Sequence, residues 1–280
     1  MDEPKKDKFT LSITESPSEF ENLEKMKVGE LVRSINKEDA KVHLAVYNAL
    51  PQIEKLIELV LDRMCRGGRI FYLGAGTSGR LGVLDASELP PTFGVPDTLV
   101  IGLIAGGDAA LRKAVEAAED DMDKAWFELQ ERNINELDSV IGIAASGSTP
   151  YVVGGLQRAR ENGVLTGCIT CNPGSRVAEA AEYPIEVIVG PEFVTGSTRL
   201  KAGTAQKMVL NMITTTIMIK MGRVKGNKMV NMQLTNKKLV VRGTRMLMEE
   251  LGLDEEPARN LLLIHGSVKK ALESQKKRKQ

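Results

Sequence analysis

Five short apolar runs alternate with helical patterns through the middle of this chain, and this alternation restricts its fold more than any other feature. The runs cover Arg69–Leu73, Thr98–Ile104, Ser139–Ala144, Val164–Thr170 and Ile185–Val189. Each has the length of a strand and is rich in Val and Ile, and its near-continuous apolarity indicates burial on both faces. We therefore predict an α/β fold with a five-stranded parallel sheet between helices, a doubly wound three-layer sandwich.

Helical patterns fill the stretch before these runs and most intervals between them. Apolar residues recur at three- and four-residue steps over about Ser18–Arg66, where Pro51 should begin or kink a helix. Further helices are expected over Ala109–Glu131 and Tyr151–Asn162. Residues 1–20, rich in Ser, Pro and charge, are expected to form an irregular arm.

The last part of the chain has a different character. Gly203–Met221 predicts a long apolar helix, and the residues from about Asn236 predict a compact set of three short helices. These short helices should be divided at glycines, namely Gly243, Gly252 and Gly266. We expect an N-terminal arm and helix (1–50), a sheet domain that binds the ligand (51–225) and a small C-terminal helical subdomain (226–280).

The charge balance excludes several functional classes. The chain has 38 Lys and Arg against 37 Asp and Glu, which argues against a general nucleic-acid or membrane-surface binder. The polar N-terminus has no apolar signal core, and no stretch approaches the roughly 18 apolar residues of a membrane span. We therefore expect a cytoplasmic protein.

The pair Cys168 and Cys171 has the C-x-x-C spacing of some metal and redox sites. Positions three apart in a strand point to opposite faces, and the chain has only two histidines and no second Cys pair. We therefore predict two buried thiols and no metal at this place.

Ligands of an open parallel sheet bind beyond the carboxyl ends of its strands, so the segments that follow the apolar runs matter most. These segments are Gly74–Arg80, Ala105–Asp108, Ala145–Pro150, Asn172–Ser175 and Thr195–Arg199.

The first of these segments matches G-x-G-x-x-G, which alone is weak evidence for a dinucleotide. A dinucleotide site also needs an acidic residue that ends the second strand, but Asp108 comes only after Gly106 and Gly107. Ser146, Ser148 and Thr149 instead offer hydroxyls just before a helix, which suits a single phosphate dianion. The alternative is that these residues only cap the helix.

Two glutamates stand near these segments. Pro90 and Pro91 should end the helix that follows the first predicted strand. Glu88 would then occupy the last turn of this helix, where a carboxylate opposes the helix dipole. Such a local conflict tends to mark a functional position. Glu119 is expected in the middle of a helix, and its pattern alone favours an ordinary exposed acid.

Long stretches of the chain resemble one enzyme family. They include the segment from Gly74 to Gly94, GAGTSGRLGVLDASELPPTFG, together with IAGG, AAEDD, ASGSTP and GSTRLKAGTAQK further on. These stretches closely resemble the signature of the N-acetylmuramic acid 6-phosphate etherases, from about Asn36 to Leu272. Leu89 and Asn231 depart from the family pattern, which commonly has Cys and Asp at these places.

The resemblance implies a sugar isomerase (SIS) domain of flavodoxin-like architecture, usually dimeric with its sites at the interface. It implies cleavage of the lactyl ether of N-acetylmuramic acid 6-phosphate to N-acetylglucosamine 6-phosphate and D-lactate in peptidoglycan recycling, without a cofactor. The catalytic pair falls on Glu88, taken as the acid, and Glu119, taken as the C2 base.

The phosphate is expected to contact the hydroxyl-rich loops at Thr77, Ser78, Ser146, Gly147, Ser148 and Thr149. Lys201 and Glu192 are weaker candidates for the pocket. A non-catalytic sensor of sugar phosphates, of the kind related to glucokinase regulatory proteins, and a phosphosugar isomerase are the alternatives.

Overall fold

A five-stranded sheet forms the centre of the molecule in the computed structural model, which describes residues 12–115, 117–234 and 236–277. The strand order is β2-β1-β3-β4-β5, and every neighbouring pair is parallel. The strands are β1 (Ile70–Gly74), β2 (Val100–Ile104), β3 (Ser139–Ile143), β4 (Leu165–Thr170) and β5 (Tyr183–Glu186). The predicted parallel sheet is confirmed.

The last strand begins two residues earlier than the apolar run predicts. Tyr183 and Pro184 pair with β4, and proline is tolerated there because β5 is an edge strand. The Val187 N–H still donates to the carbonyl of Thr170 at 2.8 Å, so the end of the predicted run continues the ladder.

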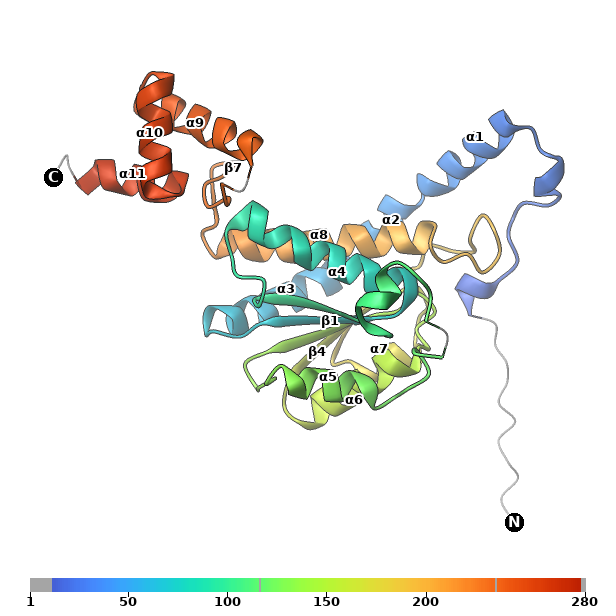
Figure 1. The fold of residues 1–280 in the computed structure, drawn as a ribbon. Helices are drawn as coiled ribbons and strands as arrows, with labels where there is room; N and C mark the ends of the chain where they lie inside the picture. Colours follow the sequence, from blue (N-terminus) through green and yellow to red (C-terminus); the bar gives the residue numbers. More distant parts are fainter. Residues whose placement is uncertain (1–11, 116, 235, 278–280) are drawn as a thin grey trace, which may run out of the picture.

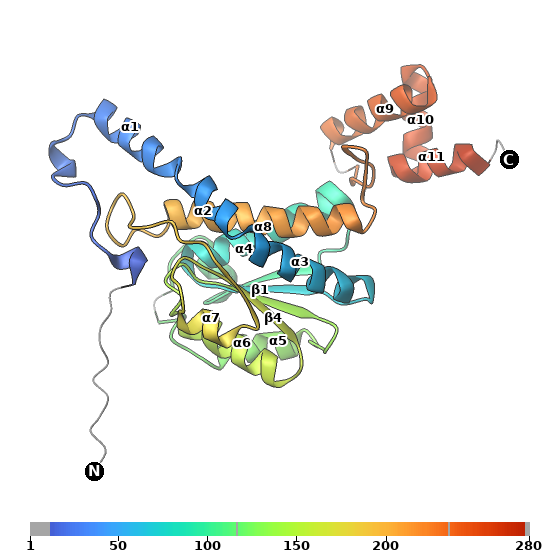
Figure 2. The same ribbon diagram turned by 180° about the vertical axis from the view of Figure 1, so that it is seen from behind.

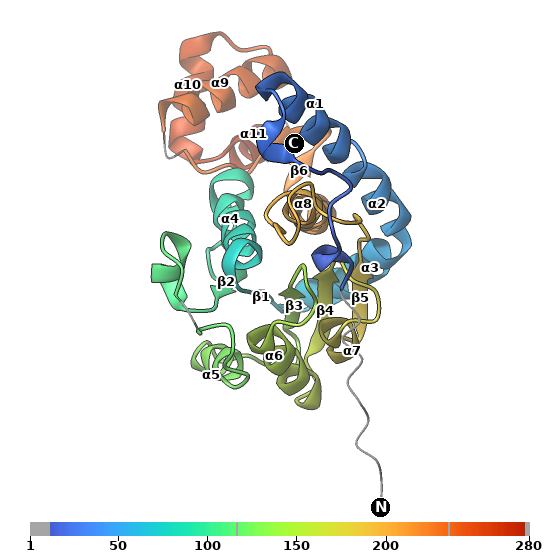
Figure 3. The ribbon, with the colours of Figure 1, turned by 90° about the vertical axis from the view of Figure 1, so that its right-hand side faces the viewer.

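Helices cover both faces of the sheet and complete three layers (Figures 1 and 3). In β1, Ile70 and Tyr72 pack into one apolar cluster, whereas Phe71 and Leu73 pack into the other. This alternation is the reason that two helical layers are needed, because each face of a strand presents apolar side chains. One layer holds α3 (Leu50–Cys65), α4 (Gly76–Phe93) and α8 (Lys201–Lys220), and the other holds α5 (Lys124–Glu131), α6 (Pro150–Glu161) and α7 (Arg176–Ala180).

The first and the last helices of the chain extend from the layer of α3, α4 and α8. Figures 1 and 2 show α1 (Val28–Asp39) and α2 (Val42–Asn48) at one end of α8, and the C-terminal helices at the other. Two short 3-10 turns, η1 (Ile13–Glu15) and η2 (Leu23–Lys25), precede α1. Pro51 is the second residue of α3, as predicted for a helix start. Among the described residues, no helix combines the length and apolarity needed to cross a membrane.

The C-terminal helices bury an apolar core of their own. They are α9 (Lys237–Leu251), α10 (Glu255–His265) and α11 (Val268–Lys277), preceded by the hairpin of β6 (Val224–Lys225) and β7 (Lys228–Met229). The breaks at Gly252 and Gly266 are confirmed. The predicted break at Gly243 is wrong, because α9 continues through this residue. A Cβ on Gly243 would lie 2.7 Å from Leu262 Cδ2, so the glycine allows α9 and α10 to pack closely.

The predicted helix over Ala109–Glu131 is also wrong. The chain forms a 3-10 turn, η3 (Gly107–Leu111), and α5 begins only at Lys124. Ala117 has a φ of 60°, which interrupts a right-handed helix. The Asp121 side chain then accepts the N–H groups of Asp123 and Lys124, an interaction that favours a helix start over a continuing helix.

The end of α4 differs from the prediction as well. The helix includes Pro90 and Pro91 and ends at Phe93, where Gly94 takes a φ of 63° and donates its N–H to the carbonyl of Pro90. A Cβ on Gly94 would lie 2.0 Å from the carbonyl oxygen of Asn231. Glu88 therefore stands more than one turn before the end of α4, which weakens the argument from the helix dipole.

The C-x-x-C pair divides between the two faces of the sheet, as its strand spacing predicts. Cys168 belongs to the cluster with α5, α6 and α7, and Cys171 belongs to the cluster with α3, α4 and α8. Both thiols are free and buried, and burial raises the pKa of each to about 12.

Selective alkylation tests this placement. At pH 8 the folded protein should take up one iodoacetamide group, at the exposed Cys65, because the two buried thiols are both protonated and inaccessible. Unfolding in guanidinium should raise the count to all three cysteines. Peptide mass spectrometry gives the modified positions, and rapid labelling of Cys168 in the folded protein would contradict the structure.

Candidate active site

A polar pocket of about 420 Å³ lies at the carboxyl ends of β1 and β3. Because these strands are neighbours, the segments that follow them meet at one edge of the sheet. The lining residues come from these two segments, from the Glu119 turn and from two further places in the chain. They are Glu15, Ala75, Gly76, Thr77, Ser78, Glu119, Asp120, Ala144, Ala145, Ser146, Ser148, Thr149, Pro150 and Thr198.

The first wall of the pocket is the N-terminus of α4. Gly76 begins this helix, and Thr77 and the buried Ser78 stand in its first turn. The Ser78 hydroxyl lies 3.0 Å from Oε1 of Gln206 and donates to it, which orients the hydroxyl. A Cβ on Gly79 would lie 2.6 Å from Ile104 Cγ1, so a glycine is required for α4 to start this close to the sheet.

The second wall is the loop between β3 and α6. Ser148 donates its hydroxyl to Ser146 Oγ at 3.1 Å and its N–H to the same atom at 3.3 Å. Thr149 is the N-cap residue of α6, yet its side chain makes no capping hydrogen bond. The alternative that these hydroxyls only cap the helix is therefore wrong for Thr149, whose side chain is left at the pocket wall.

Gly147 shapes this loop without lining the pocket. Its φ is 71°, and a Cβ would lie 2.2 Å from Ser175 Oγ. Its N–H donates to the carbonyl of Ala144, so this backbone group is already used within the turn. Of the six residues predicted to bind a phosphate, the other five line the pocket.

Two helix N-termini converge on the pocket, those of α4 and α6. The N–H groups in the first turn of α4 have no partners within the helix, and the dipole of each helix gives its N-terminus a partial positive charge. In α6, Pro150 has no N–H and the N–H groups of Tyr151 and Val152 donate to carbonyls, so this helix contributes its dipole. Together with the serine and threonine hydroxyls, the two helix N-termini form an environment suited to a compact anion.

Glu119 lines this pocket beside the start of α6. It lies in a turn, and its carbonyl accepts the N–H of Tyr151 in the first turn of α6 at 2.9 Å. The segment after it also presses against α6, because a Cβ on Gly154 would lie 1.8 Å from the carbonyl oxygen of Met122. The exposed carboxyl group of Glu119 thus shares one pocket with the hydroxyl-rich loops.

Glu88 lies elsewhere. It borders a separate hollow of about 210 Å³ between α4 and α8, together with Asp85, Lys207 and Asn211. Asp85 accepts hydrogen bonds from Asn211 and from the hydroxyls of Tyr72 and Thr214, and burial raises its pKa. Glu88 and Glu119 therefore line two different hollows of one chain.

The two weaker candidates, Glu192 and Lys201, are buried at the start of α8. Glu192 accepts the N–H groups of Lys201 and Ala202, and burial raises its pKa. The Lys201 ammonium pairs with the Glu38 carboxylate at 2.6 Å. Burial raises the pKa of Glu38, but hydrogen bonds from Lys201 and Lys41 lower it. The hydrogen bonds have the larger combined effect, so the pKa of Glu38 is lowered. Neither residue lines the pocket.

Three acidic or hydroxyl residues of the pocket were not predicted from the sequence: Glu15, Asp120 and Thr198. Glu15 comes from the segment expected to be an irregular arm, and no spacing or motif pointed to it. Asp120 and Thr198 did stand in segments quoted for the family resemblance. In the described parts of the chain, no three His, Cys, Asp or Glu side chains gather in a way that suits a metal ion.

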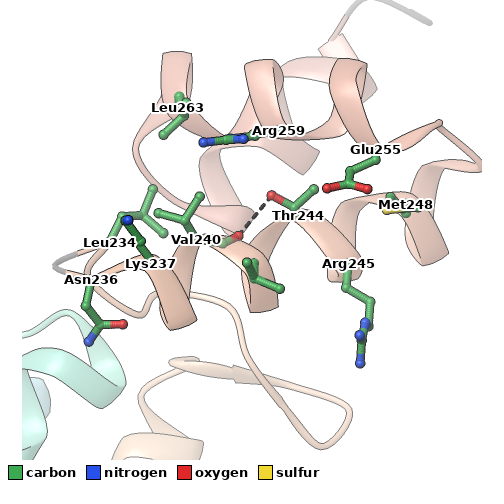
Figure 4. A pocket seen from close by; sticks show the side chains of 11 residues that line it. Leu234, Asn236, Lys237, Val240, Thr244, Arg245, Met248, Glu255, Arg259 and Leu263 are labelled. Carbon is green, nitrogen blue, oxygen red and sulfur yellow. Dashed lines mark hydrogen bonds between the residues drawn. The ribbon is translucent and has the colours of Figure 1, made fainter.

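A larger hollow of about 840 Å³ lies far from the strand ends, between α9 and α10 (Figure 4). Its walls are aliphatic and basic side chains such as Val240, Leu263 and Arg259, and the Thr244 hydroxyl donates to the carbonyl of Val240. It contains none of the residues predicted to bind or act on a phosphosugar.

Comparison with known proteins agrees with this arrangement. The SIS domain model matches residues 122–216, and the model of the glucokinase regulatory protein N-terminal SIS domain matches residues 52–160. N-acetylmuramic acid 6-phosphate etherase from Bacteroides fragilis is 65% identical over 266 residues, covering 95% of this chain and 95% of the relative. The enzyme of this name from Christiangramia forsetii is 64% identical and covers 94% of this chain and 96% of the relative. This chain belongs to the N-acetylmuramic acid 6-phosphate etherase family.

Solved structures similar to this etherase family member show the same fold. A phosphoheptose isomerase from Francisella tularensis aligns with a TM-score of 0.55 and 15% identity over 69% of this chain and 98% of that chain. A putative phosphosugar isomerase from Bacteroides fragilis aligns with a TM-score of 0.53 and 22% identity, over 69% and 92% of the two chains. The SIS-type fold implied by the sequence is thus confirmed.

The close contact at Gly154 generates a stability prediction. Gly154→Ala would force a methyl group onto the Met122 carbonyl and displace the segment that carries Glu119. We expect a loss of about 1–3 kcal/mol in the free energy of unfolding, measured by urea denaturation. The matched control is Gly29→Ala in α1, where the nearest atoms belong to the flexible Arg33 side chain. Equal stability of both variants would contradict the packing described here.

Proposed function

We propose that this chain cleaves the lactyl ether of N-acetylmuramic acid 6-phosphate, yielding N-acetylglucosamine 6-phosphate and D-lactate. The observation that supports it most is the pocket at β1 and β3, which a carboxylate, that of Glu119, lines together with the hydroxyl-rich starts of two helices. One part of the pocket suits a phosphate and the other suits acid-base chemistry on a sugar. Membership of the etherase family supports the choice of bond.

The phosphate is assigned to the hydroxyl side of the pocket. Its proposed partners are Thr77 and Ser78 in the first turn of α4, and Ser146, Ser148 and Thr149 before α6. The hydroxyls of Ser78 and Ser148 donate to Gln206 and Ser146 in this structure, so binding requires them to rotate toward the ligand. A dianion gains from both helix dipoles and from several hydrogen bonds at once. Gly147 supports this loop through its backbone conformation, not through a contact with the ligand.

The reaction is an elimination followed by addition of water. In the open-chain sugar, the C1 aldehyde acidifies the proton on C2, and the lactyl oxygen on C3 is the leaving group. Glu119 removes the C2 proton, a double bond forms between C2 and C3, and Glu88 protonates the departing lactate oxygen. Water then adds to C3 and a proton returns to C2. The overall change is a hydrolysis without a change in oxidation state, so it requires no nicotinamide.

A second copy of the chain is the proposed source of the acid. Ser78 and Glu88 lie ten positions apart in α4, a rise of about 15 Å along the helix axis. A carboxyl group so placed does not reach the phosphate end of its own pocket. We therefore propose a homodimer in which Glu88 of each protomer completes the pocket of the other.

An exposed apolar side chain beside Glu88, and others on α1 and α2, support such an interface. Leu84 lies one turn before Glu88 in α4, borders the same hollow and is 49% exposed. In α1 and α2, Val28, Val32 and Tyr47 are exposed by more than half. Exposed apolar side chains of this size offer surface that a second chain can cover.

Each glutamate should be required for turnover. Glu88→Gln and Glu119→Gln should each lower kcat for D-lactate release from N-acetylmuramic acid 6-phosphate by about 10²–10⁴-fold, because each removes one acid-base group. A coupled D-lactate assay measures the rate, and circular dichroism checks that the variants fold. Near-full activity of both variants would refute the assignment of the pair.

Mixing the two inactive variants tests whether the pair spans two chains. In a heterodimer of Glu88→Gln and Glu119→Gln protomers, one of the two shared sites regains both carboxyl groups. Random pairing should therefore restore about a quarter of the wild-type activity. If both glutamates acted within one chain, co-expressed and purified mixtures would stay inactive.

The same assay separates the alternatives. A non-catalytic sensor would bind the phosphosugar through the hydroxyl-rich loops but release no D-lactate. An isomerase would also begin at C2, but its product would keep the mass of its substrate. Mass spectrometry of the products distinguishes these outcomes in one experiment.

The remaining proposals concern context. We propose that the enzyme works in the cytoplasm in the recycling of peptidoglycan amino sugars. Within the chain, residues 51–225 are proposed to bind the phosphosugar, residues 1–50 to form the arm and first helices, and residues 226–280 to form a separate helical subdomain.

A further inference from the structure

The N-terminal segment 12–20 crosses the strand-end loops before the chain turns away into α1. Figures 1 and 2 show the turn η1 beside these loops, separated from the rest of the N-terminal helices. The Glu15 carboxylate on this turn lines the same pocket as Glu119 and the hydroxyl-rich loops. The proposed etherase chemistry assigns no role to it.

The residue before Glu15 is firmly anchored. Thr14 is fully buried, and its hydroxyl accepts a hydrogen bond from Nδ2 of Asn172 at 2.9 Å. The same amide donates to the carbonyls of Ala145 and Ser146, at 2.9 and 3.1 Å. Asn172 thus links the N-terminal segment directly to the loop that forms the second wall of the pocket.

The residues after Glu15 are anchored as well. Ser18 donates its N–H to Thr195 Oγ1 at 2.9 Å and its hydroxyl to the carbonyl of Phe193 at 2.8 Å. The Phe20 ring packs on Phe193 with ring centroids 4.7 Å apart. Because both sides of Glu15 are held, its position at the pocket is set by tertiary contacts and not by a loose arm.

The backbone around Gly196 leaves room for the Glu15 side chain. A Cβ on Gly196 would lie 3.0 Å from Glu15 Oε2, and the φ of Gly196 is 74°. The carboxylate therefore lies against a glycine loop on one side and opens to the pocket on the other.

A carboxylate in this place has a definite electrostatic consequence. It repels a phosphate dianion and attracts hydrogen-bond donors. A phosphosugar carries both kinds of group: the phosphate offers only acceptors, whereas the ring hydroxyls and the amide N–H offer donors. Since the hydroxyl-rich loops already suit the phosphate, Glu15 suits the sugar end of the ligand.

We propose that Glu15 is a substrate-binding residue that accepts a hydrogen bond from a hydroxyl or amide N–H of the sugar and so selects a phosphosugar over bare phosphate. This proposal rests on the proposed function of the same pocket. Thr14 acts as a positioning residue, because its bond to Asn172 holds Glu15 in place.

The test is the variant Glu15→Gln, which keeps the size of the side chain and removes its charge. We expect KM for N-acetylmuramic acid 6-phosphate to rise about ten-fold, because a charge-assisted hydrogen bond becomes a neutral one. Competitive inhibition by inorganic phosphate should stay the same or become tighter, because a nearby negative charge is gone. The matched control is Glu21→Gln, an exposed glutamate of the same N-terminal region that lies outside the pocket lining.

The outcomes are distinct. An unchanged KM in Glu15→Gln would overturn the proposal, and so would an equal weakening of substrate and phosphate binding, which would indicate a purely structural role. A wild-type protein that releases no D-lactate would instead overturn the proposed function, and the proposal for Glu15 with it. Glu21→Gln should match the wild type in both measurements.

Discussion

The parallel alignment of five strands that are apolar on both faces is the constraint on which the rest of this structure depends. Apolar side chains on both faces require two helical layers, and parallel neighbours require each connection to cross back over the sheet. Every segment that follows a strand therefore begins at the same edge. The loops after β1 and β3 meet there because these strands are neighbours in the order β2-β1-β3-β4-β5, although they are well separated in sequence.

Local contacts then turn this edge into a pocket. Glycines let the backbone approach closely where a side chain would collide, as Gly79 does against Ile104 and Gly147 against Ser175. The amide of Asn172 connects the loop after β4 with the loop after β3 and with the N-terminal segment at Thr14. Hydrogen bonds in such a buried place are stronger than in water. This one side chain therefore holds together three segments that are far apart in the sequence.

The two glutamates proposed for catalysis are placed by different constraints. The position of Glu119 is set by a contact with the loop after β3, because the Tyr151 N–H donates to the Glu119 carbonyl at the start of α6. The position of Glu88 is set by the length of α4. This residue lies about three turns beyond the helix start, in a hollow beside α8 and away from the pocket. The proposed catalysis by both acids therefore requires a pair of chains, and the exposed Leu84 beside Glu88 provides apolar surface for the proposed contact.

The sequence by itself determined the parallel sheet, the burial of Cys168 and Cys171 on opposite faces and five of the pocket residues, because strand periodicity and loop composition are local properties. The prediction of helices from the sequence was wrong where tertiary contacts overrule the local preference of the residues. The helix predicted over Glu119 is broken by the positive φ of Ala117. In contrast, α9 continues through Gly243, where the glycine allows Leu262 of α10 to pack closely. Only the tertiary structure decided that Glu15 enters the pocket and that Glu88 does not, because both outcomes depend on contacts between segments far apart in the chain.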